Sequence, residues 1–92
     1  MTTTHTLQDG CSWNPATAEG TFYLTDRGSN VECVVPLQTL IERFPASSLS
    51  DEGTLQTHER TLRSVAQILI LQGCGRGGRL VIRGIDFLGR MD

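Results

Sequence analysis

Residues 21–44, TFYLTDRGSNVECVVPLQTLIERF, decide the fold because the hydrophobic period changes partway along them. Alternating residue character over 21–25 and 31–35 predicts two β-strands around a polar turn at 26–30, where Gly28 can adopt a positive φ. Directly after Pro36, apolar residues recur at helical spacing as far as Phe44, and Pro45 ends the pattern. The stretch therefore predicts a β-hairpin followed at once by a short helix.

The alternation in the two strands also predicts which of their side chains face the core. Side chains two positions apart lie on the same face of a strand, so the larger apolar residues select the inner face. The predicted inner residues are Phe22, Leu24, Val31, Cys33 and Val35, with Glu32 and Val34 on the opposite face.

A second helix is predicted from Ser50, a favourable N-cap residue, to about Gln72, with Gly73 as its C-terminal breaker. Its core-facing stripe consists of Leu55, Leu62, Val65, Ala66 and Leu69. Ile68 and Leu71 lie off that stripe, and a helix on a single sheet needs only one stripe. The extra pair indicates a second packing partner, which is either the first helix or another subunit.

The remaining segments complete an α+β prediction. Alternation predicts a strand over 79–85, after which Phe87 and Leu88 close the core; a short strand around 11–13 would let Trp13 anchor the N-terminal arm on the sheet. The element order (β)ββααβ predicts a two-layer sandwich, in which a small antiparallel sheet, made of the hairpin and the C-terminal strand, packs against two helices. We expect one domain over 10–88, with a flexible tail at 1–9 and a C-terminal tail at 89–92.

The 92-residue chain has a net charge of −2, and the charges are unevenly distributed. Residues 1–59 have a net charge of −6 and residues 60–92 of +4. This split marks a polyanion-binding face or a head-to-tail partner surface, unless the two signs screen each other within the fold. The three cysteines, Cys11, Cys33 and Cys74, form no close pairs, which favours reduced thiols in a reducing compartment. No secretory pattern or long apolar run is present, so we expect a cytoplasmic protein without membrane contact.

No sequence motif predicts catalysis, a metal site or a cofactor. Residues 73–78, GCGRGG, match a dinucleotide-binding fingerprint literally, but they follow a predicted helix and precede a strand, so the helix end facing the loop is negative. A linker is the better interpretation of this loop. His58 and Cys74 are too far apart along the predicted helix to act together, and the cysteines and histidines lack zinc-ligand spacing.

The residues above resemble a family of short bacterial proteins, domain of unknown function 1488. The similarity rests on an early Trp13, the strand bearing Phe22, Gly28 in the turn, the Val31–Val35 strand, Leu40 and Phe44 in the short helix, and Arg60 in the later helix. It covers about residues 11–87. The resemblance implies a compact α+β fold in a bacterium, and it implies no activity, catalytic residue or cofactor.

The sequence thus predicts a non-enzymatic binding or regulatory module. One hypothesis is a homodimer with Ile68 and Leu71 as contact residues, or a complex with another protein. The alternative is a nucleic-acid-associated regulator in which Arg76, Arg79 and Arg83 contact a nucleic-acid backbone or another anion.

Overall fold

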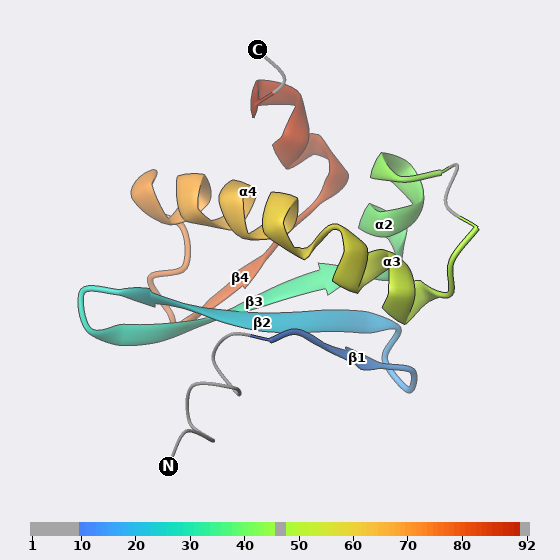
Figure 1. Cartoon of the computed structure of the whole chain (residues 1–92). Coiled ribbons are helices and arrows are strands. Elements are labelled where there is room, and N and C mark those ends of the chain that lie inside the picture. Colours follow the sequence, from blue (N-terminus) through green and yellow to red (C-terminus); the bar gives the residue numbers. More distant parts are fainter. Residues whose placement is uncertain (1–9, 46–47, 91–92) are drawn as a thin grey trace.

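The computed structural model describes residues 10–45 and 48–90, and in these ranges every helix lies on the same face of a four-stranded sheet (Figure 1). The strands are β1 (Ser12–Asn14), β2 (Glu19–Asp26), β3 (Ser29–Pro36) and β4 (Arg79–Val81), in the sheet order β1-β2-β3-β4. The helices are α2 (Leu37–Arg43), α3 (Asp51–Thr57), α4 (Glu59–Leu71) and the 3-10 helix η1 (Gly84–Arg90). The predicted two-layer α+β fold is confirmed.

The β2–β3 hairpin closes at a two-residue turn. Asp26 pairs with Ser29, and the residues between them, Arg27 and Gly28, have φ of 55° and 83°. Positive φ at both central positions is typical of a type I′ turn, whose twist matches that of the flanking strands. The register places Phe22 opposite Cys33, and both are fully buried under the helices, as the alternation predicts.

The sheet is mixed, which corrects the prediction that it is antiparallel throughout. β4 runs parallel to β3, while β1, β2 and β3 pair in antiparallel fashion. The reason is that α2 is only seven residues long and stays near the end of β3, so α3 and α4 together carry the chain back across the sheet (Figure 1). One return crossing brings the next strand in parallel to the last.

The single helix predicted over 51–72 is two helices, because the chain bends at His58. Ser50 is the N-cap, as predicted, and its side chain accepts a hydrogen bond from the Gly53 amide at 3.1 Å. At His58 the backbone has φ −104° and ψ 15°, and the imidazole stacks on Phe44 with ring centroids 3.7 Å apart. The bend thus coincides with a ring contact to the residue that follows α2.

The core lies between the sheet and α4. The predicted stripe of Leu55, Leu62, Val65, Ala66 and Leu69 is buried, and Ile70 joins it. Phe87 is buried, Trp13 packs against the edge of the core from β1, and Leu24 is half-buried there.

The last predicted strand is shorter than expected, ending at Val81, and η1 begins at Gly84. Leu80 and Ile82 are nevertheless buried, whereas Arg79, Val81, Arg83 and Ile85 are exposed, as the alternation predicts. The predicted tail residues 1–9 and 91–92 and the side chain of Leu88 lie outside what the structure describes.

Candidate functional site

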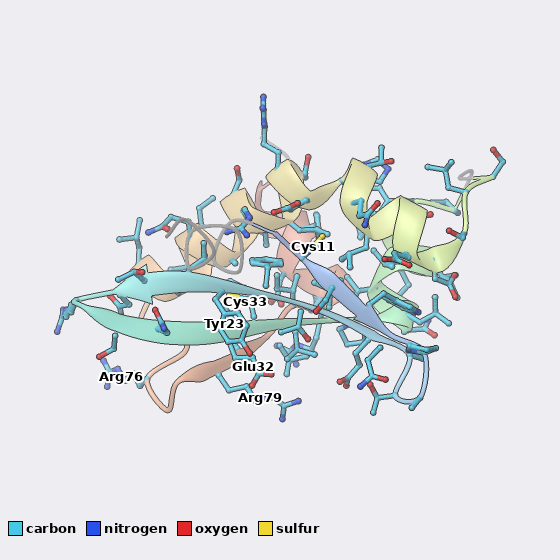
Figure 2. All side chains as sticks on the ribbon, turned by 60° about the horizontal axis from the view of Figure 1, so that its bottom comes forward. Cys11, Tyr23, Glu32, Cys33, Arg76 and Arg79 are labelled. Carbon is cyan, nitrogen blue, oxygen red and sulfur yellow. The ribbon has the colours of Figure 1, made fainter. Side chains whose placement is uncertain are left out.

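The three arginines predicted to contact nucleic acid all lie at the β4 side of the molecule and are exposed. Arg76 lies in the loop before β4, Arg79 begins the strand, and Arg83 follows it. Figure 2 shows Arg76 and Arg79 along the lower margin of the molecule, on either side of the loop that leads into β4. The structure therefore brings the positive charges of this segment to one border of the sheet.

Two of these arginines have carboxylates nearby. Arg79 lies 3.8 Å from Glu32 on β3, and Arg83 lies 3.9 Å from Asp86 in η1. Exposed pairs at such distances contribute at most about 1 kcal/mol, so both guanidinium groups stay available to a competing anion. The same carboxylates reduce the attraction for a polyanion such as nucleic acid, and that hypothesis stays a prediction.

The sheet face opposite the helices was not predicted as a surface of interest. We call it the open face, and it contains Thr21, Tyr23, Glu32, Val34, Arg79 and Val81. Tyr23, Glu32 and Arg79 are cross-strand neighbours and form a row across three strands (Figure 2). In the next row Val34, which pairs with Thr21 and Val81, is only 1% exposed although it lies on the open face.

The two residues predicted as dimer contacts lie on the outer face of α4, which faces away from the core. This face consists of Arg60, Thr61, Ser64, Gln67, Ile68 and Leu71. Leu71 is 77% exposed, whereas Ile68 is half-buried. A groove of about 890 Å³ runs beside the same face, and its lining residues include Leu24 of β2 and Arg60, Ser64 and Gln67 of α4.

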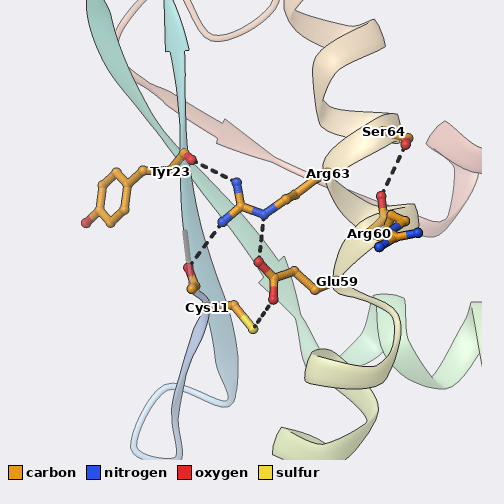
Figure 3. Close-up of polar contacts among 7 residues, drawn as sticks. Cys11, Tyr23, Glu59, Arg60, Arg63 and Ser64 are labelled. Atoms are coloured by element: carbon orange, nitrogen blue, oxygen red, sulfur yellow. Dashed lines mark hydrogen bonds and ion pairs between the residues drawn. The ribbon is translucent and has the colours of Figure 1, made fainter. Parts of the chain in front are cut away.

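Arg63 joins the N-terminal segment, β2 and α4 (Figure 3). Its guanidinium donates to Glu59 Oε2 at 2.7 Å and to the carbonyl oxygens of Tyr23 and Gly10 at 3.2 and 3.3 Å. The same group lies 4.9 Å from the centroid of the Phe22 ring. These contacts reach three separate parts of the fold, so the role of Arg63 is structural.

The thiols nearest the core are poor nucleophiles. Burial, reinforced by the neighbouring Glu59 carboxylate, raises the pKa of Cys11 to about 11, and Cys11 Sγ donates to Glu59 Oε1 at 3.5 Å. Burial also raises the pKa of Cys33 to about 11. Because the thiolate is the reactive form, both thiols are nearly unreactive at neutral pH. Cys74 is exposed in the loop after α4.

The groups considered for acid–base or nucleophilic chemistry do not converge. His58 lies at the start of α4 and stacks on Phe44, while Cys74 lies beyond the other end of the same helix. Asp86 accepts a hydrogen bond from the Arg83 amide at 2.8 Å. Within the described residues no group of three His, Cys, Asp or Glu side chains could hold a metal ion.

The glycine-rich loop over 73–78 is a shaped connection between α4 and β4. Gly73, Gly75 and Gly78 all have positive φ. A Cβ at Gly75 would lie 3.1 Å from Val31, so the loop packs against the hairpin at that point. The loop and the hairpin turn together line a hollow of about 590 Å³ that includes Arg27, Cys74 and Arg76.

These features define a small one-sided α+β protein with an arginine-bearing sheet border and an outer helix face on which Arg60 is the one charged side chain. None of the helices in the described ranges is long and apolar enough to cross a membrane. The chain belongs to the family described as protein of unknown function (DUF1488), whose sequence model matches residues 7–82. The predicted resemblance is confirmed. No curated protein and no solved structure matches the chain.

Proposed function

We propose that this protein is a non-enzymatic binding module that acts as a homodimer, with two copies packed through the outer face of α4. The observation that carries the proposal is the exposure of Leu71, 77%, on a helix face whose only charged side chain is Arg60. Solvent-facing helix surfaces of monomers are normally rich in charge. Here the middle of the face offers Thr61, Ser64 and Gln67 instead.

A second copy is the partner that this surface fits best. In a two-fold symmetric contact the same surface of both subunits comes together. A surface with many charges of one sign would therefore be repelled by the identical surface of the partner, whereas a surface with few charges would not. The small side chain of Ser64, near the middle of the face, allows two helices to approach closely. The groove beside α4 extends the available contact towards Leu24 of β2.

The single charge on the outer face also suits an antiparallel pair of α4 helices. The last turn of α4 contains no basic residue, so the negative end of its dipole is not balanced within the helix. With the two-fold axis between Ser64 and Gln67, Arg60 of each copy would lie opposite Leu71 of the other, at that negative end. Charge and register therefore favour the same arrangement.

The positions of the reactive groups support a role without catalysis. His58 and Cys74 lie beyond opposite ends of α4, and the remaining two thiols have raised pKa values. A nucleophile needs a general base within hydrogen-bond reach, and His58 does not reach Cys74. The Cys11 thiol does contact the Glu59 carboxylate, but its pKa is raised to about 11. We infer that the protein works by contact rather than by chemistry.

A charge-swap series tests the proposed dimer. Leu71→Arg favours the helix end in a monomer but would face Arg60 of the other copy, so we expect dissociation to become about tenfold to a hundredfold easier. Adding Arg60→Glu to that variant should restore the dimer, because each new arginine then faces a glutamate. The mass in solution is measured by light scattering across a concentration series.

Ile41→Glu is the matched control, because Ile41 is 53% exposed but lies on α2. It should leave the mass unchanged. Equal effects of Leu71→Arg and Ile41→Glu, or a double variant that stays dissociated, would contradict the antiparallel arrangement.

A further inference from the structure

We propose that the outer edge of β4 binds an extended, acidic segment of a partner protein by strand addition. β4 is the last strand in the sheet order and pairs with β3 on its inner side. No other strand of the described residues lies against its outer side. An edge of this kind is the site at which peptide-binding sheets accept an additional strand.

The backbone of β4 leaves a short row of hydrogen-bonding groups on the outer side. Gly78 O accepts from the Glu32 amide at 2.8 Å, and the Ile82 amide donates to Val34 O at 2.8 Å. These two bonds fix the groups that point towards β3. Because alternate residues of a strand direct their N–H and C=O to opposite sides, the N–H and C=O of Arg79 and Val81 point outward. They can pair with about three residues of an added strand.

The charges around this edge select an acidic partner. Arg76, Arg79 and Arg83 border it, and the sequence contains no Asp or Glu between Glu59 and Asp86. Side chains of Arg79 and Arg83 are 57% and 70% exposed, and their own carboxylates are near the distance limit for an ion pair. An acidic side chain on the added strand could replace those weak contacts. A second copy of this chain would instead bring the two sets of arginines together, which disfavours self-pairing at β4.

The side chains of β4 also indicate the pattern of the added strand. Arg79 and Val81 lie on the open face, and Leu80 between them is buried towards the helices. In an added strand the residues next to Arg79 and Val81 would share that face, so an acidic and an aliphatic side chain two positions apart suit them. The residue between them would lie on the same side of the sheet as Leu80, towards the helices, and a small residue fits either surrounding.

The edge lies apart from the outer face of α4, so this inference and the proposed dimer can fail independently. The probe is a short fluorescein-labelled peptide in which Glu and Val alternate at every second position with Ser between them. Fluorescence anisotropy of the wild-type protein should rise saturably with protein concentration. Arg79→Glu and Arg83→Glu should each weaken binding about fivefold, because an attractive exposed pair becomes a repulsive one.

Arg27→Glu is the control, because Arg27 carries the same charge but lies in the hairpin turn. It should change binding less than twofold. A version of the peptide with N-methylated amides keeps its charge but cannot donate backbone hydrogen bonds to β4, and we expect it not to bind.

Three results would overturn the inference. One is no binding of the acidic peptide at all, in which case the arginines only protect an exposed edge from aggregation. Another is equal binding of the N-methylated peptide, which would indicate charge attraction without strand pairing. The third is tighter binding of a single-stranded oligonucleotide with the same number of charges, which would assign the arginines to nucleic acid.

Discussion

Gly20 of β2 gives the sharpest test of how the helices are seated on the sheet. It is buried in the strand, and it pairs with Trp13 on one side and Val35 on the other. A Cβ built at Gly20 would lie 2.5 and 2.7 Å from the two methyl carbons of Leu55 in α3. Leu55 is fully buried, so its side chain has no solvent-side space into which it could move.

The expected cost of Gly20→Ala follows from that geometry. Contacts this short cannot persist, so either Leu55 leaves its rotamer or α3 moves away from β2. Overpacking of this kind typically costs about 1–3 kcal/mol, and we expect the upper part of that range because both methyl groups are involved. For a domain of this size the loss corresponds to a decrease in Tm of roughly 8–20 °C.

A double-mutant cycle assigns the cost to the Gly20–Leu55 contact. Leu55→Ala alone should lower the free energy of unfolding by about 2–5 kcal/mol, because it leaves a cavity. The double variant should lose at least about 1 kcal/mol less than the sum of the single variants, because the added methyl group enters that cavity. The free energies are measured by urea denaturation followed by circular dichroism.

Gly77→Ala is the matched control, since a Cβ at Gly77 meets no atom within 4 Å and the residue does not have a positive φ. It should change stability by no more than about 0.5 kcal/mol. If Gly20→Ala were as mild as Gly77→Ala, or if the cycle were additive, α3 would not pack on β2 as described.

Three further predictions concern single side chains. Arg63→Met should lower the free energy of unfolding by about 1–3 kcal/mol in urea denaturation, because it leaves Glu59 and two backbone carbonyls without their charged donor, whereas Arg76→Met should have almost no effect. In native protein at pH 8 a thiol reagent should modify Cys74 rapidly, and Cys74→Ser should abolish the fast phase; a fast phase that survives this change would refute the burial of Cys11 and Cys33. Because those two thiols have folded pKa values of about 11 against an ordinary value of 9.0, their contribution to stability is complete below pH 9 and is lost as the pH rises to 11. The decrease in unfolding free energy over that range should be smaller in Cys33→Ala. An unchanged pH dependence in this variant would mean that the raised pKa of Cys33 does not cause the decrease.

Local elements of the fold could be predicted because their determinants are close together in the sequence. The hairpin turn at Gly28, the N-cap at Ser50 and the core stripe of α4 depend on neighbours within a few residues. The direction of β4 could not be predicted in this way. It depends on how many times the helical segment crosses the sheet, and the shortness of α2 is what leaves a single crossing.

Contacts between residues far apart in the chain could not be predicted from the sequence. Arg63 is bonded to the carbonyl oxygens of Tyr23 and Gly10, which are 40 and 53 positions away. The close approach of Leu55 to Gly20 was indicated in the sequence only weakly, by a glycine within a strand pattern. The burial of Val34 also differs from the alternation, which places it on the face opposite the core.

The candidate surfaces were predicted in part. The exposure of Arg79, Arg83 and Leu71 agrees with the sequence pattern, because alternation and helical period determine which side chains face outward. The open face and the outer edge of β4 were not foreseen, because both depend on the order of the strands in the sheet.

The most direct test of the proposed function is the mass of the intact wild-type protein in solution by sedimentation equilibrium. We predict a mass of twice the 10.1 kDa of the chain, with dissociation on dilution. A single-chain mass at every concentration up to the solubility limit would contradict the homodimer and leave the outer face of α4 without its proposed partner.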